Sequence, residues 1–159
     1  MKFQVLLNGD KTLLEANPDE PLRNVLRRAG CLSIKKGCSK GQCGSCSVLI
    51  NGKISASCKI PVSLAQDDDI ITLEYFSRTE EYRTIMEGFE KAGIHLCGYC
   101  NAGKIFTAFQ LLNMHKKLTR DEIKAAVRNL PPCCTEFDTL VNGIIYAVNI
   151  NNQKEKDHE

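Results

Sequence analysis

The chain has 159 residues, of which 43% are hydrophobic and 25% are charged, enough for one ordinary domain or two small ones. Its 21 basic and 19 acidic residues nearly balance, which argues against a nucleic acid or an acidic membrane as the main partner. No segment resembles a membrane span or a secretory signal, so we expect a cytoplasmic location. In that compartment its nine cysteines favour metal or redox chemistry over structural disulfides.

The beginning of the chain predicts a hairpin followed by a helix. Apolar residues alternate over Lys2–Leu7, residues 8–10 form a turn signal, and residues 11–15 are expected to pair back onto the first strand. Residues 18–30 place apolar side chains at helical spacing, and Gly30 suits the end of that helix.

Further strands are expected after the cysteine-rich stretch. Ser47–Ile50 and residues 53–57 flank Asn51-Gly52, a strong signal for a two-residue hairpin turn. Residues 70–76 read as a last strand. The first half therefore predicts a small sheet that embraces one helix.

The second half of the chain changes to helical periodicity. Thr119 and Glu122 match a capping box, and Asp138 or Thr139 is expected to cap the last helix. Four short helices in a small bundle are predicted. Their apolar stripes are Ile85, Met86, Phe89 and Ala92; Ile105, Ala108, Phe109 and Leu112; Ile123, Ala126, Val127 and Leu130; and Leu140, Val141, Ile144, Ile145 and Val148.

The change of periodicity divides the chain into two expected domains. The first covers residues 1–76, and the polar stretch 77–83 is expected to link it to a helical domain over residues 84–150. The polar residues 151–159 are expected to form a flexible tail.

The first cysteine group has a specific spacing. Cys38, Cys43, Cys46 and Cys58 follow Cys-x4-Cys-x2-Cys-x11-Cys, the arrangement of plant-type [2Fe–2S] sites. Two irons and two bridging sulfides need four thiolate ligands. A zinc site is the alternative, but zinc ligands normally come as two close pairs rather than three ligands in one loop. The spacing therefore predicts a [2Fe–2S] cluster.

Glycines lie among these ligands. Gly37, Gly41 and Gly44 allow backbone N–H groups to turn toward the sulfur atoms without clashes from Cβ atoms. We expect these three glycines to take part in binding the cofactor.

The second cysteine group consists of two close pairs. Cys97 and Cys100 precede one expected helix, and Cys133 and Cys134 precede another. Helix N-termini offer free N–H groups and a positive dipole end, which favour an anionic cluster. The spacing by itself leaves three possibilities open, namely a second cluster, a zinc site, and free or disulfide-bonded thiols.

Taken together, these motifs resemble the small iron–sulfur subunit of the molybdenum hydroxylases, the xanthine dehydrogenase and aldehyde oxidoreductase family. The likeness covers nearly the whole chain. The segments that carry it are 37–49, Asn51-Gly52, Ser57-Cys58, 97–100, Gly103, Asn129-Leu130 and Cys134-Thr135.

The resemblance implies an α+β fold in which a plant-ferredoxin-like β-grasp domain precedes a four-helix [2Fe–2S] domain. It implies that all eight cysteines of the two groups bind two clusters. The chain would transfer electrons from a molybdopterin-binding large subunit to an FAD-binding medium subunit during oxidation of a purine or similar N-heterocycle. It would hold no substrate site of its own.

The chain departs from the family pattern around the second cysteine group. Leu96 replaces a usual Gln, Asn101-Ala102 replaces a usual Thr-Pro, and Cys133 stands directly beside Cys134. A second hypothesis is therefore a one-cluster ferredoxin domain fused to a zinc-stabilised docking module or a thiol redox sensor.

Three residues outside the motifs have simple interpretations. Cys31 is expected to be a small buried residue, and His158 is expected to lie on the surface. His95 is interpreted as an ordinary loop residue, although a histidine can replace a thiolate in some clusters.

Overall fold

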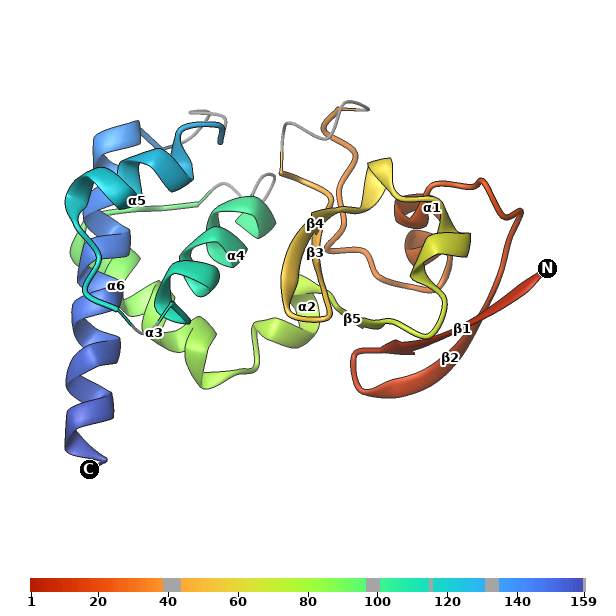
Figure 1. Ribbon diagram of the computed structural model, residues 1–159. Helices are drawn as coiled ribbons and strands as arrows, with labels where there is room; N and C mark the ends of the chain where they lie inside the picture. The colour runs from red at the N-terminus through yellow and green to blue at the C-terminus, as the bar shows by residue number, and fades with distance from the viewer. Residues whose placement is uncertain (39–43, 97–100, 115, 131–134, 159) are drawn as a thin grey trace.

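The structure is a computed structural model that describes residues 1–38, 44–96, 101–114, 116–130 and 135–158. A sheet-containing half and a helical half lie side by side, and the two ends of the chain lie at opposite ends of the molecule (Figure 1). This arrangement confirms the expected α+β class. Among the helices described, none is both long enough and apolar enough to cross a membrane.

Five strands form one mixed sheet. They are β1 (Lys2–Leu7), β2 (Asp10–Glu15), β3 (Ser47–Ile50), β4 (Lys53–Ala56) and β5 (Asp69–Ile71). Their order is β2-β1-β5-β3-β4, so the two hairpins form the edges and β5 joins them. The β1–β5 pair is parallel and the other pairs are antiparallel.

Both predicted hairpins are confirmed. The turn between β1 and β2 places Asn8 at φ 51° and Gly9 at φ 88°, and the turn between β3 and β4 places Asn51 at φ 51° and Gly52 at φ 82°. Two successive positive φ angles define a type I′ turn, whose twist matches that of the strands. Asparagine and glycine are the residues that adopt this conformation at least cost.

The predicted first helix is shorter than its sequence pattern. Helix α1 spans Leu22–Arg28, and Pro21 occupies its N-cap. The Leu22 amide donates to the Ile60 carbonyl at 2.8 Å, so the chain before α1 is held against the segment after β4. Gly30 follows the end of the helix at φ 98°, as expected for a residue beyond the C-cap.

The predicted strand over residues 70–76 is corrected by the structure. Strand β5 ends at Ile71, and Leu73–Phe76 forms the short helix α2. The Asn8 side chain accepts from the Thr72 amide at 2.9 Å, and its Nδ2 donates to the Thr72 hydroxyl at 3.0 Å. The Asn8 side chain thus takes the place of a neighbouring strand as the hydrogen-bond partner of the Thr72 amide. The chain leaves the sheet at this residue and continues into α2.

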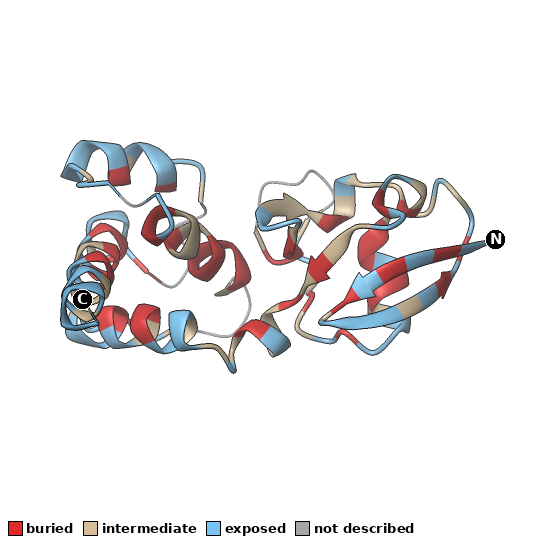
Figure 2. Ribbon diagram, turned by 60° about the horizontal axis from the view of Figure 1, so that its bottom comes forward, coloured by how far each residue is buried: buried red, intermediate tan, exposed pale blue. Residues whose placement is uncertain are grey.

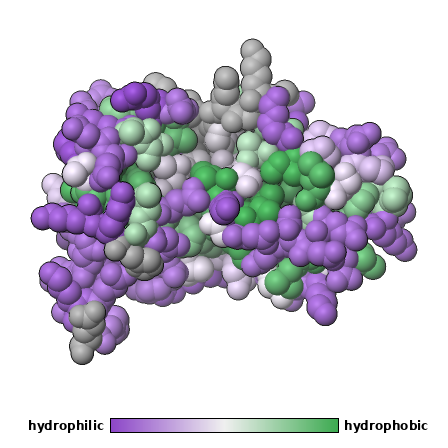
Figure 3. Space-filling view, viewed as in Figure 1, coloured by the Kyte–Doolittle hydropathy of each residue, from purple (hydrophilic) through white to green (hydrophobic). Residues whose placement is uncertain are grey.

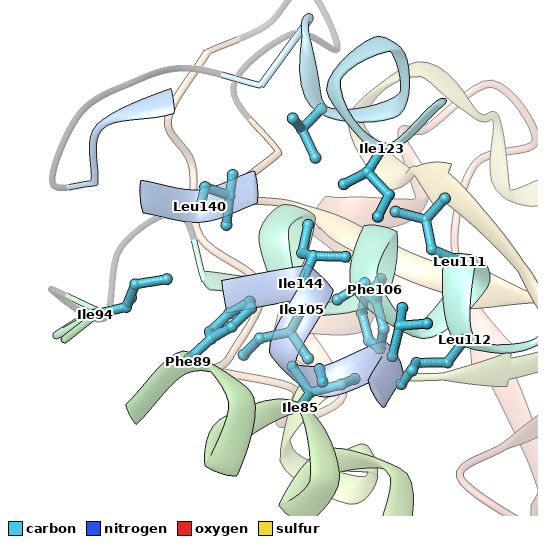
Figure 4. Close-up of a cluster of buried hydrophobic side chains, with 14 of the residues drawn as sticks. Ile85, Phe89, Ile94, Ile105, Phe106, Leu111, Leu112, Ile123, Leu140 and Ile144 are labelled. Carbon is cyan, nitrogen blue, oxygen red and sulfur yellow. The ribbon is translucent and has the colours of Figure 1, made fainter. Parts of the chain in front are cut away.

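Four longer helices build the second half, as predicted. They are α3 (Glu80–Lys91), α4 (Asn101–Leu112), α5 (Arg120–Val127) and α6 (Phe137–Asp157). Their apolar side chains converge on one interior (Figure 4). The predicted capping box at the start of α5 is confirmed: the Thr119 hydroxyl accepts from the Glu122 amide, and the Glu122 carboxylate accepts from the Thr119 amide. A Cβ on Gly88 would lie 2.4 Å from the Ala147 nitrogen, so α3 and α6 cross at very close range.

The C-terminal segment differs from its prediction. Residues 151–157, expected to belong to a flexible tail, continue α6 through Asp157. Lys154 in this segment bonds to Glu80 and Thr84 of α3 at 3.1 and 3.0 Å, which offsets the cost of ordering a polar helix end. At its other end α6 begins at Phe137 with Glu136 as N-cap, earlier than the predicted caps Asp138 or Thr139.

Helix α3 begins inside the segment expected to be a linker. Its N-cap is Thr79, whose hydroxyl accepts from the Tyr82 amide at 3.2 Å. Glu80 and Glu81 then occupy the first turn, where carboxylates interact favourably with the helix dipole. The polar residues of the predicted linker therefore include the first residues of a helix.

The two halves share one apolar cluster. Leu49 of β3 is 3% exposed and belongs to the core of the helices, and Ile54, Ile71 and Leu73 pack against that core. Buried residues accordingly line the facing sides of the two halves (Figure 2). One face of the molecule is largely polar, with apolar residues gathered near its middle (Figure 3). The sheet and the helices are therefore packed against each other rather than merely tethered.

Candidate metal centres

The structure describes three members of the first cysteine group. Cys38, Cys46 and Cys58 are present as thiols rather than disulfides. Cys46 is 2% exposed, while the other two are partly exposed. Cys43 lies outside the described residues, and so does Gly41.

The β3–β4 hairpin positions Cys46 and Cys58. Its register pairs Ser47 with Ala56, so Cys46 and Ser57 come next at the open end of the hairpin. The buried hydroxyl of Ser57 donates to the Cys46 carbonyl at 2.6 Å. Cys58 follows in the short 3₁₀ helix η1 (Ser57–Lys59). Two thiols far apart in the sequence are thereby held at one end of a rigid element.

The loop between Cys38 and Cys46 is held by backbone hydrogen bonds at its base. The Lys35 amide donates to the Ser45 carbonyl at 2.9 Å, and the Ser47 amide donates to the Gly44 carbonyl at 3.1 Å. Gly44 adopts φ 75°, a conformation that a side chain would strain. Gly37 lies exposed before Cys38. Glycine therefore suits the backbone conformation at position 44, while the part of the three glycines in binding the cofactor stays a prediction.

Helix α1 holds the segment that leads into this loop. Arg23 donates through Nη1 to the Cys38 carbonyl at 3.0 Å, and Arg27 donates through Nη1 to the Ile34 carbonyl. Two guanidinium groups one helical turn apart thus bind carbonyls at both ends of the segment 34–38. Arg23 is itself buried, at 6% exposure.

The donor chemistry of the first group fits an iron–sulfur cluster. Within the described ranges, no three histidine, cysteine or acidic side chains gather as a ready metal site, and Cys43 is not among those residues. The described ligand candidates are all thiols, the usual ligands of iron in [2Fe–2S] clusters. The three described thiols and the positive φ of Gly44 are compatible with the predicted ligand group.

The second cysteine group lies outside the described residues, since Cys97, Cys100, Cys133 and Cys134 all fall there. The structure does describe the helix that comes after each pair. Helix α4 begins directly after Cys100, at Asn101, and α6 begins three residues after Cys134. The prediction that each pair precedes a helix is confirmed, whereas the ligand role of the pairs stays a prediction.

The residues outside the motifs behave as structural groups. Cys31 is 6% exposed. Burial, followed by the negative charge of Glu74, raises the pKa of the Cys31 thiol to about 11. His95 and His158 are not buried, and the surface position expected for His158 is confirmed. Cys31 is therefore a protonated, buried thiol at neutral pH.

Two buried cations were missed at the sequence level. Arg23 and Lys104 are the charged side chains buried in the part of the chain that the structure describes, at 6% and 1% exposure. Both lie at positions where the helical pattern would accept an apolar residue, so periodicity could have flagged them. Each belongs to a helix beside a cysteine group, which makes them candidates for interacting with a bound anion.

Comparison with known proteins assigns the family. Residues 4–87 match the family described as 2Fe-2S iron-sulfur cluster binding domain, and residues 72–145 match the [2Fe-2S] binding domain. The small FeS subunit of nicotinate dehydrogenase from Eubacterium barkeri is 34% identical over 143 residues, covering 89% of this chain and 91% of the relative. The chain belongs to the family of small iron–sulfur subunits of the molybdenum hydroxylases.

Two further similar proteins match most of the chain. The xanthine dehydrogenase iron-sulfur-binding subunit of Escherichia coli O157:H7 is 33% identical over 145 residues, or 90% of this chain and 91% of the relative. A chain of quinoline 2-oxidoreductase from Pseudomonas putida 86 superposes with a TM-score of 0.84 at 28% identity and 98% coverage of both chains. The resemblance inferred from the cysteine motifs is confirmed, and so is the succession of a ferredoxin-like and a helical domain.

Proposed function

We propose that this chain carries electrons from a molybdopterin-binding large subunit to an FAD-binding subunit of a molybdenum hydroxylase. The observation that supports this proposal is a [2Fe–2S] binding domain in each half of the chain. Two one-electron carriers in series suit a chain that connects two cofactors held by different subunits. The similar proteins named above are subunits of dehydrogenases, in keeping with a role inside a larger complex.

The substrate class is proposed from the same relatives. Their names refer to nicotinate, xanthine and quinoline, which are all nitrogen heterocycles. We therefore place the oxidation of an N-heterocycle on the partner that holds the molybdopterin. We also propose a cytoplasmic location, where thiolate ligands are protected from disulfide formation.

The chain's own residues bind and shield the carriers. When bound, a [2Fe–2S] cluster accepts and releases one electron at a time. Cys38, Cys43, Cys46 and Cys58 are the proposed ligands in the ferredoxin-like domain. The second proposed set is Cys97, Cys100, Cys133 and Cys134. Ser57 and the β3–β4 hairpin keep Cys46 in place, and Gly44 gives its loop the required backbone conformation.

The second hypothesis, a one-cluster domain joined to a zinc module or a thiol sensor, is not favoured. It requires the helical half to hold zinc or reactive thiols, whereas residues 72–145 match a [2Fe-2S] binding domain. The alignments with two similar iron–sulfur subunits cover about nine-tenths of this chain.

Metal analysis of the chain purified without oxygen tests the proposal. We expect about four irons and four acid-labile sulfides per chain, with two distinct EPR signals after reduction. Two irons with one zinc would support the second hypothesis instead. Replacement of Cys134 by Ser should remove one EPR signal, and Cys133→Ser tests its neighbour in the same way. Copurification of a molybdopterin protein and a flavoprotein with the tagged chain tests the partner assignment.

A further inference from the structure

Arg23 is a buried cation beside the first cysteine group. Arg23 is 6% exposed and lies on the short helix α1. Nη1 donates to the Cys38 carbonyl at 3.0 Å, and Nε donates to the Asn24 side-chain oxygen at 3.3 Å. Both acceptors are neutral. No carboxylate of the described residues lies within ion-pairing distance of this guanidinium.

A buried charge of this kind needs an anion nearby. Removing a guanidinium from water costs free energy that hydrogen bonds to neutral oxygens only partly offset. Four thiolates and two sulfides outweigh the charge of two ferric ions, so a [2Fe–2S] cluster is anionic even when it is oxidised. Only four covalent bonds separate the Cys38 carbonyl oxygen from the Cys38 sulfur. The guanidinium of Arg23 therefore lies close to a proposed thiolate ligand.

We propose that Arg23 is a positioning residue that fixes Cys38 and raises the reduction potential of the first cluster. The inference rests on the proposed cluster-binding role and concerns the ferredoxin-like domain only. Reduction adds a negative charge to the cluster, and a nearby positive charge in a region of low dielectric stabilises the reduced form more than the oxidised form. Hydrogen bonds and charges around the sulfur atoms are known means of setting such potentials.

Arg27 provides a matched comparison on the same helix. It also donates Nη1 to a backbone carbonyl of the segment, but at Ile34, four residues before the ligand. Its side chain is partly exposed, so water screens its charge more strongly. A general effect of removing one positive charge from α1 would appear in both positions. An effect of proximity to Cys38 would appear at Arg23 alone.

Potentiometric titration followed by EPR tests the inference on the full chain with both clusters bound. Arg23→Gln keeps a hydrogen-bond donor and removes the charge, Arg23→Lys keeps the charge, and Arg27→Gln is the control. We expect Arg23→Gln to shift the reduction equilibrium of the first cluster about tenfold toward the oxidised form, which corresponds to about 59 mV for one electron. Arg23→Lys and Arg27→Gln should shift it less than about twofold. The second cluster should not respond.

The outcomes separate this inference from the function on which it rests. An unchanged first-cluster potential in Arg23→Gln overturns the role of Arg23, and so does an equal shift in Arg27→Gln. Loss of the first cluster from Arg23→Gln, with the second retained and Arg23→Lys fully loaded, supports the positioning role. Loss of both clusters from Arg23→Gln, with the other variants loaded, overturns it, because a general folding defect would then explain the result. A wild-type chain without four irons would refute the proposed function instead.

Discussion

Gly44 and Gly103 meet through their backbones, and a Cβ atom on Gly103 would lie 3.0 Å from the Gly44 Cα. Gly44 directly follows Cys43 of the first cysteine group, and Gly103 is the third residue after Cys100 of the second group. The contact joins the ligand loop of the ferredoxin-like domain to the first turn of α4. A Cβ atom on either glycine would be tighter than most Cβ contacts, so the two segments that follow the proposed ligands pack at close backbone range.

Replacing Gly44 by Ala tests this contact. Alanine at φ 75° costs about 1–2 kcal/mol from backbone strain alone. Its Cβ would also lie 3.2 Å from the Gly103 Cα, so the ligand loop and the start of α4 must separate by a few tenths of an ångström. We expect a larger loss of stability in urea unfolding than strain explains, and weaker magnetic coupling between the two reduced clusters.

Gly93 is the control for that prediction. It has φ 74°, nearly the same conformation, and no described atom lies within 4 Å of the position that its Cβ would take. Gly93→Ala should therefore show the strain cost without the change in coupling. Equal effects of the two substitutions would mean that the Gly44–Gly103 contact contributes nothing.

Phe76 connects α2 to the helical core. It is 3% exposed, and its ring centroid lies 5.3 Å from that of Phe106 and 4.9 Å from that of Phe109. We expect Phe76→Ala to lower the free energy of unfolding by about 3–5 kcal/mol, because it removes a buried aromatic ring and leaves a cavity. The neighbouring Tyr75 is 40% exposed, so Tyr75→Ala should cost about 0.5 kcal/mol or less. Denaturation by urea measures both, and similar losses would contradict the assignment of Phe76 to the core.

The interaction of α3 with the end of α6 predicts an acid-sensitive stability. Hydrogen bonds from Lys154 and then Arg83 lower the pKa of Glu80 below its ordinary value of 4.5. Because the folded-state pKa is depressed, the stabilisation is present above the ordinary value and is lost as the pH falls through the folded-state pKa. Glu80→Gln should reduce stability at neutral pH and flatten its decline in acid.

Glu81 provides the comparison for Glu80. It also lies in the first turn of α3, but it forms no ion pair with any described residue. Thermal unfolding of Glu81→Gln across the acidic range should follow the wild-type curve more closely than Glu80→Gln does. If the Glu80 variant kept the full wild-type pH dependence, the ion pairs of α6 would not be formed in solution.

Cys31 is expected to be unnecessary for iron binding. Burial raises the pKa of the Cys31 thiol to about 11, so the group stays protonated where a cluster ligand must be a thiolate. Cys31→Ala should keep the full iron and sulfide content, whereas Cys46→Ala should lose about half of each. Since the folded-state pKa is raised, wild-type stability should also fall as the pH rises from about 9 toward 11, and Cys31→Ala should remove that loss. Loss of iron from Cys31→Ala would assign it a ligand role.

Local rules were sufficient for much of the fold. Asn51-Gly52 predicts its hairpin because few other residue pairs adopt two positive φ angles at low cost. Thr119 and Glu122 predict the start of α5 because each satisfies a free backbone group of that turn. The cysteine spacing predicts a ligand loop since covalent spacing limits which thiols can reach one cluster. All of these signals act over a few residues.

Contacts between distant segments decided the rest. Residues 73–76 have the composition of a strand, yet they form α2 because Phe76 packs against Phe106 and Phe109 of α4. Residues 151–157 have the polarity of a tail, yet they are helical where Lys154 reaches Glu80. The burial of Arg23 against Cys38 depends on how α1 docks on the sheet. The sequence by itself determined which cysteines are candidate ligands and how they are spaced. The tertiary structure decided which charges and backbone groups surround the described ones, because those neighbours come from elements far apart in the chain.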